Sequence, residues 1–137
     1  MSGGDKESRS EALARRLAEI ADAKAATEIV ALNMRSLVSY TDFLVVCTAR
    51  NERQARAIAE EVRLKLKQEG GLLPSGSEVT EAAGWIVLDY LDVVLHVFTA
   101  EARERYQLED LWREAPRLEL VTSGDGVRGH LYGAAHG

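Results

Sequence analysis

The chain has 137 residues, of which 46% are hydrophobic and 28% charged, a composition typical of a single globular domain. It excludes a wholly disordered or low-complexity protein, while the single cysteine, Cys47, excludes an internal disulfide and a cysteine-based zinc site. Lysine and arginine number 17 against 22 aspartates and glutamates, a formal net charge of −5. We therefore expect no direct sequence-specific binding of nucleic acid.

The N-terminal residues 1–7 contain acidic side chains and lack the hydrophobic core of a signal peptide, so we expect a flexible leader on a cytoplasmic protein. The longest apolar run, residues 43–47, is far shorter than the ~20 residues of a membrane helix, and no membrane partner is expected. Ser8 followed by Glu11 fits a capping box, and an apolar stripe after it predicts a helix over residues 9–25.

Two strand patterns follow this helix. Residues 28–34 form a short β-branched run, which predicts a strand, and residues 35–41 form a polar connection. Residues 42–48 are apolar without alternation, which is typical of a strand buried on both faces. We therefore expect this second strand to be central in a sheet.

A second helix is predicted to begin at Asn51, a good capping residue, with Gln54 three residues later. One face of this helix carries an apolar stripe made of Ala55, Ile58, Ala59, Val62 and Leu66. Gly70 and Gly71 end the helix in a left-handed turn. Residues 72–81 predict a loop with at most a short edge strand.

Residues 85–90 and 93–98 are two strand patterns separated by two residues, a spacing that predicts a β-hairpin. The turn is either a two-residue turn at Leu91 and Asp92 or a wider turn over residues 90–92. Both alternatives stay open, because neither turn residue is a glycine.

The hairpin is followed by a helical region. Thr99 can cap a helix over residues 100–106, and a second helical turn runs over residues 108–112 until Pro116 stops it. These elements predict an α/β fold, a single small domain in which helices flank a mixed β-sheet.

The domain is expected over residues 8–118, between the leader at residues 1–7 and a flexible tail at residues 119–137. The tail is rich in glycine and small polar residues from residue 122 onward and has no apolar period.

Catalytic motifs of hydrolases, zinc proteases and Walker-type nucleotide-binding proteins are absent from the sequence. Cys47 and His96 would form a nucleophile–base pair only if their strands are neighbours and both side chains share a face. A buried thiol and a hydrogen-bonded core or interface histidine is the favoured interpretation.

Asp89 and Asp92 carry the carboxylates that would suit Mg²⁺, yet a spacing of three residues across a turn does not bring them together. We interpret them as turn residues and expect no catalytic residue, metal or cofactor.

Aromatic residues concentrate in one part of the chain, residues 85–112. These residues are Trp85, Tyr90, Phe98, Tyr106 and Trp112. Tryptophan and tyrosine at the ends of elements often anchor interfaces, whereas the alternative is packing of the last helix on the hairpin. Both interpretations stay open, with Trp112 favoured as a core residue.

Four segments, in this order, resemble the ribosome silencing factor family (RsfS, or Iojap). They are residues 39–43, 51–54, 84–98 and 105–112. The likeness spans about residues 10–113, and the hairpin followed by Tyr-x-Leu-Glu-x-Leu-Trp is its specific part. The chain departs from the family at Leu91 and Val79, where many members have glycine, and both positions fall in predicted loops.

The resemblance implies a nucleotidyltransferase-like fold without the catalytic set, and a homodimer. It implies binding of the large ribosomal subunit through ribosomal protein L-fourteen, which would block joining of the small subunit and repress translation. By its position in the motifs, the family's exposed tryptophan corresponds to Trp85, its tyrosine to Tyr106, and its Asp-x-x-x-His pair to Asp92 and His96. We expect Trp85, Tyr106 and Leu108 to form one exposed patch for the partner, with His96 in the same site and polar residues such as Asp92 at the edge.

Two other functions remain as alternatives. One is a metal-dependent, nucleotidyltransferase-like enzyme that uses Asp89 and Asp92, and the other is a dimerisation module of a different complex. The enzyme would need a phosphate-binding loop at a helix N-terminus and a third acid, and neither is recognisable in the sequence.

Overall fold

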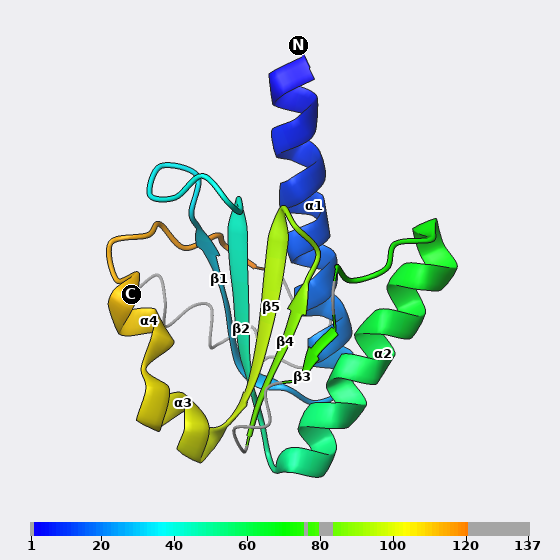
Figure 1. Cartoon of the computed structure of the whole chain (residues 1–137), viewed down its shortest axis with the longest axis vertical. Coiled ribbons are helices and arrows are strands. Elements are labelled where there is room, and N and C mark those ends of the chain that lie inside the picture. Colours follow the sequence, from blue (N-terminus) through cyan, green and yellow to red (C-terminus); the bar gives the residue numbers. More distant parts are fainter. Residues whose placement is uncertain (1, 76, 80–83, 121–137) are drawn as a thin grey trace.

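The computed structural model describes residues 2–75, 77–79 and 84–120. Within these residues, four helices and five strands follow one another in the order that the sequence patterns predict (Figure 1). They are α1 (Ser2–Ala23), β1 (Thr27–Asn33), β2 (Phe43–Ala49), α2 (Glu52–Gly70), β3 (Ser77–Val79), β4 (Trp85–Asp89), β5 (Val93–Thr99), α3 (Ala100–Tyr106) and α4 (Leu108–Leu111).

The five strands form one mixed sheet in the order β1-β2-β5-β4-β3. Only β2 and β5 are parallel, whereas the other neighbours are antiparallel. Helices α1 and α2 cover one face of the sheet, and α3 and α4 lie on the opposite side (Figure 1). The predicted α/β class with a mixed, helix-flanked sheet is confirmed.

Strand β2 is interior and buried on both faces, as its unbroken apolar sequence predicts. Its side chains alternate between the two layers, because successive residues of a strand point to opposite faces. Phe43, Val45 and Cys47 pack with α1 and α2, whereas Leu44 and Val46 belong to smaller clusters on the opposite face. The strand therefore holds the two layers together.

Helix α2 begins and ends as the sequence predicts. The Asn51 side chain accepts the backbone N–H of Gln54 at 2.8 Å, and Gly71 ends the helix in the left-handed conformation. The Gln54 amide also donates to the carbonyls of Lys24 and Ala25, in the connection between α1 and β1. Gln54 thus joins the start of α2 to the connection between α1 and β1, which lies far away in the sequence.

The predicted beginning of the first helix is wrong. Helix α1 begins at Ser2 and ends at Ala23, so the expected leader at residues 1–7 is helical from residue 2 and Ser8 lies inside the helix. A capping-box pattern is therefore not sufficient to start a helix, since no proline precedes it to prevent the helix from extending further.

The C-terminal part of the domain extends beyond the predicted limit at residue 118. Asn33 donates its N–H to Pro116 and Leu118 donates to Ala31, so this segment covers the outer edge of β1. Leu120 is buried against the main core. The remainder of the predicted tail, residues 121–137, lies outside the described residues.

The hairpin turn is the wider of the two alternatives, with residues 90–92 between β4 and β5. Tyr90 donates its N–H to the carbonyl of Val93, and the Asp89 carboxylate accepts the N–H of Leu91 at 2.7 Å. Leu91 has a φ of +72°, in the left-handed region that glycine tolerates best. Its side chain is 63% exposed, so packing does not compensate this backbone strain.

Replacing Leu91 with glycine is expected to raise the free energy of unfolding by about 0.5–1 kcal/mol. The substitution removes a left-handed strain of about 1–2 kcal/mol, and the greater freedom of glycine in the unfolded chain offsets part of the gain. Urea unfolding measures the difference. Leu91→Ala is the matched control, because it shortens the same exposed side chain but keeps the strain. Equal stability of the glycine and alanine variants would contradict this account.

Candidate functional site

The face of the sheet opposite α1 and α2 carries a cluster of aromatic side chains. Trp85 pairs with Phe98 across the β4–β5 ladder, and their ring centroids are 5.1 Å apart. Tyr106, at the end of α3, places its ring 4.7 Å from that of Trp85. Phe98 is buried, Trp85 is half-buried and Tyr106 is 37% exposed. The predicted proximity of Trp85 and Tyr106 is confirmed.

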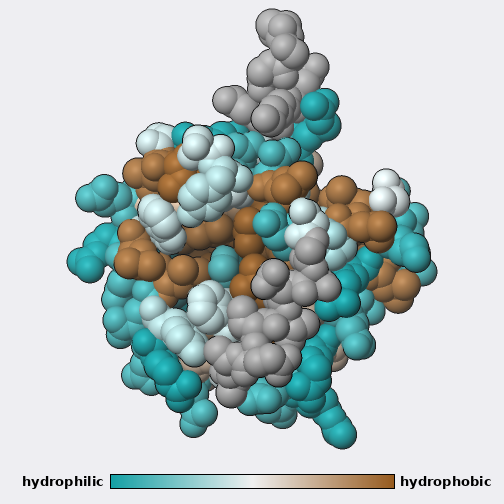
Figure 2. Space-filling view, in the orientation of Figure 1, coloured by the Kyte–Doolittle hydropathy of each residue, from teal (hydrophilic) through white to brown (hydrophobic). Residues whose placement is uncertain are grey.

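Leu108, the first residue of α4, packs on the same cluster together with Trp85. We call Trp85, Tyr106 and Leu108 the aromatic surface. Phe98 and Val46 form its buried floor. Apolar residues gather over the middle strands on the side seen in Figure 1, with hydrophilic residues around them (Figure 2).

The link between the hairpin and α3 fixes how the aromatic surface is assembled. Thr99 accepts the N–H of Ala102 with its hydroxyl, as the capping prediction requires, and donates its own N–H to the carbonyl of Gly84 at 2.8 Å. Gly84 has a φ of +84°, and a Cβ atom there would lie 2.4 Å from the Thr99 hydroxyl oxygen. The absence of a side chain at Gly84 therefore lets α3 begin directly beside Trp85.

His96 lies beneath the aromatic surface and is 9% exposed. The indole Nε1–H of Trp85 donates to Nδ1 of His96 at 3.1 Å. Burial lowers the pKa of His96 to about 4, although the nearby Asp89 carboxylate acts in the opposite direction. The imidazole is therefore neutral near pH 7 and carries its proton on Nε2.

Cys47 and His96 do not form a nucleophile–base pair. Their strands are neighbours, but Cys47 packs in the core beneath α1 and α2, whereas His96 lies on the opposite face with Trp85. Burial raises the pKa of the Cys47 thiol to about 12. The interpretation of a buried thiol and a hydrogen-bonded histidine is supported by these positions.

Asp92 does not lie beside the aromatic surface. The hairpin places Trp85 at the open end, paired with Phe98, and Asp92 in the turn at the other end. Contiguity in sequence suggested proximity, but an extended strand separates its two ends. The carbonyl of Asp92 accepts the N–H groups of Asp42 and Phe43, so this residue anchors the turn to β2.

The turn acids Asp89 and Asp92 serve the hairpin in this structure. The Asp89 carboxylate accepts a turn N–H, as described above. Within residues 2–75, 77–79 and 84–120, no group of three or more His, Cys, Asp or Glu residues is arranged to hold a metal ion.

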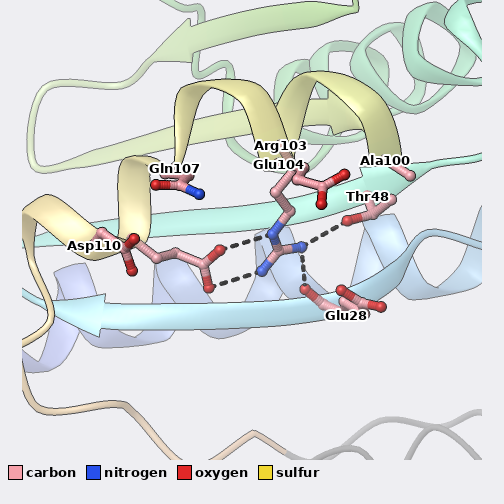
Figure 3. A pocket seen from close by; sticks show the side chains of 8 residues that line it. Glu28, Thr48, Ala100, Arg103, Glu104, Gln107 and Asp110 are labelled. Carbon is pink, nitrogen blue, oxygen red and sulfur yellow. Dashed lines mark hydrogen bonds and ion pairs between the residues drawn. The ribbon is translucent and has the colours of Figure 1, made fainter.

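Sequence reasoning missed a half-buried arginine. Arg103 of α3 donates to both carboxylate oxygens of Glu109, at 2.8 and 2.9 Å, and to the Thr48 hydroxyl and the Glu28 carbonyl (Figure 3). Burial raises the pKa of Glu109, but the hydrogen bonds and charge of Arg103 outweigh it and hold the pKa below its ordinary value. The pair fastens α3 and α4 to β1 and β2. A spacing of six residues across the left-handed Gln107 gives no helical pattern that would reveal it.

An open pocket of about 430 Å³ lies beside this arginine (Figure 3). Its lining includes Glu28, Glu104 and Asp110 in addition to the paired Glu109. Gln107, the residue after Tyr106, also lines it, so an acidic concavity adjoins the aromatic surface.

None of the helices within the described ranges is long and apolar enough to cross a membrane.

Comparison with known proteins identifies the family. Residues 7–130 match the family model described as "Ribosomal silencing factor during starvation". The chain is 42% identical to the ribosomal silencing factor RsfS of Halalkalibacterium halodurans over 72% of this chain and 84% of that protein. It is 37% identical to RsfS of Haemophilus influenzae over 74% of this chain and 98% of that protein.

Solved structures agree with the sequence relatives. A crystal structure of a Chromobacterium violaceum protein superimposes with a TM-score of 0.70 at 31% identity, over 75% of this chain and 85% of that chain. A Bacillus halodurans structure gives a TM-score of 0.64 at 39% identity, over 76% and 93% of the two chains. The chain described here therefore belongs to the ribosomal silencing factor family, RsfS.

Proposed function

We propose that this protein binds the large ribosomal subunit through ribosomal protein L-fourteen and represses translation by blocking the joining of the small subunit. The block is steric, so it needs occupancy of the site and no bond is made or broken. Family membership supports a regulatory role at the ribosome. The observation that carries the choice of contact surface is the assembled aromatic surface. The ring centroids of Trp85 and Tyr106 lie 4.7 Å apart, and both side chains are accessible.

The chemistry of this surface suits a protein partner. Tryptophan and tyrosine dominate the energetic centres of interfaces, because each offers a large rigid area with few rotatable bonds. Here the two rings rest on the buried Phe98, so they are already held in place before a partner arrives. A pre-ordered side chain loses less entropy on binding. The aromatic surface therefore has the properties of an interface anchor.

Charge supports a basic partner. The chain has a formal net charge of −5, and the pocket next to the aromatic surface is lined by Glu104 and Asp110. Ribosomal proteins are usually basic, so complementary charge would speed association and orient the complex. We assign direct contact to the aromatic surface and a rim role to these acids. A homodimer in the cytoplasm forms part of the same proposal and rests on the family resemblance.

Trp85→Ala and Tyr106→Ala are each expected to weaken binding to isolated large subunits about thirtyfold, which corresponds to about 2 kcal/mol. The measurement is a dissociation constant from co-sedimentation with purified subunits. Circular dichroism and urea unfolding confirm that each variant is folded.

Leu64→Ala is the matched control. Leu64 is an exposed apolar residue of α2, on the other side of the sheet, and its side chain is 50% exposed. This control should bind like the wild type. Wild-type affinity of both folded aromatic variants would show that the contact surface lies elsewhere.

A further inference from the structure

A directional polar contact orients the Trp85 ring. The rings of Phe98, Tyr106 and His96 lie close to it, with centroids 5.1, 4.7 and 5.9 Å away. Ring contacts with Phe98 and Tyr106 tolerate sliding and tilting. The hydrogen bond from the indole Nε1–H to Nδ1 of His96 is directional, and it fixes the rotation of the ring in its plane.

His96 is placed to make this contact by the register of the hairpin. Trp85 pairs with Phe98, and His96 lies two residues earlier on β5, on the same face. Its side chain is 9% exposed, so it is not itself a surface for a partner. The sequence resemblance would include His96 among the contact residues, whereas the geometry places it one layer below them.

We infer that His96 is the positioning residue of the aromatic surface. As a neutral imidazole, it accepts at Nδ1 a hydrogen bond from the indole N–H of Trp85. This bond holds the Trp85 ring against Tyr106 in the orientation that binds the partner. This inference rests on the proposed function, and it adds His96 as a residue that acts on the partner only through Trp85. Its requirement is an acceptor at the Nδ1 position, because a proton on that nitrogen would face the indole N–H and abolish the bond. Burial, which disfavours the charged imidazolium, supports the neutral form.

A matched pair of substitutions separates positioning from packing. Asparagine and leucine have nearly the same size, but only asparagine has an atom, Oδ1, that can accept a hydrogen bond near the position of His96 Nδ1. His96→Asn is expected to bind isolated large subunits within about twofold of the wild type, and His96→Leu about fivefold more weakly, the loss of one neutral hydrogen bond. The indole N–H of Trp85, assigned with Trp85→Phe, should exchange with solvent about fivefold faster in His96→Leu than in His96→Asn.

The wild-type chain supplies a test that needs no variant at His96. Nitrogen-15 NMR should show a non-protonated Nδ1 and a protonated Nε2 on this ring, with a scalar coupling across the hydrogen bond to Trp85 Nε1. Equal binding and equal indole exchange of the two variants would overturn the inference, as would a proton on Nδ1. If Trp85→Ala binds like the wild type, the proposed function fails, while the indole exchange still decides whether His96 positions the ring.

Discussion

Gly84→Ala is expected to lower the free energy of unfolding by about 2–3 kcal/mol, because alanine at a φ of +84° carries a strain of about 1–2 kcal/mol. The added Cβ would also meet the Thr99 hydroxyl oxygen at 2.4 Å and the Ala102 Cβ at 3.2 Å. Thr99 would have to move and would lose its cap on α3, which costs about 1 kcal/mol. Urea unfolding monitored by circular dichroism measures the sum.

Two comparisons show whether the added Cβ atom at residue 84 causes this loss of stability. Gly70→Ala serves as a control, since no neighbouring atom of the described residues beyond the helix backbone lies within 4 Å of its added Cβ, and it should stabilise the protein by about 0.5 kcal/mol. In a Thr99→Ala background the hydroxyl is absent, so the cost of Gly84→Ala should fall by about 1 kcal/mol. A cost below 0.5 kcal/mol for Gly84→Ala alone would contradict the close approach described here.

Acid is expected to destabilise the protein through His96 by about 3 kcal/mol. Burial lowers the pKa of this residue in the folded protein to about 4 from an ordinary value of 6.5, with the neighbouring Asp89 acting in the opposite direction. Between these two values the unfolded chain binds a proton that the folded chain does not. The contribution of His96 to the free energy of unfolding is therefore fully present above pH 6.5 and is lost as the pH falls towards 4.

The measurement is urea unfolding at a series of pH values, compared between wild type and His96→Asn. Both proteins share every other titrating group, including Glu109, so the difference between the two curves reports His96. The wild-type curve should descend more steeply between pH 6.5 and 4 and run parallel to the variant above pH 6.5. Parallel curves throughout this window would show that His96 titrates alike in the folded and unfolded chains.

Local patterns predicted the elements of this fold well where one sequence feature controlled one structural choice. The unbroken apolar run at residues 43–47 requires burial on both faces, and β2 has it. Asn51 and Thr99 cap α2 and α3 as their positions predict. Trp85 and Tyr106 lie together because α3 follows β5 directly at the Thr99 cap, and Trp85 pairs with Phe98 at that end of β5.

Other features depend on tertiary structure and had no local signal. Ser8 has the pattern of a helix start, yet α1 extends to Ser2. Asp92 is near Trp85 in sequence, but a strand between them places the two at opposite ends of the hairpin. Arg103 contacts Thr48 and the carbonyl of Glu28, which lie 55 and 75 residues away in the sequence. Only the pairing of β1 with β2 and the start of α3 beside them bring these groups together.

The central claim is that the aromatic surface carries the block of subunit joining, and a joining assay tests it most directly. Purified large subunits are incubated with the protein, small subunits are added, and association is followed by light scattering. The wild type and Leu64→Ala should reduce joining in proportion to the bound fraction. The folded double variant Trp85→Ala/Tyr106→Ala should leave joining as fast as in the absence of protein. Inhibition by this double variant equal to that of the wild type would contradict the account.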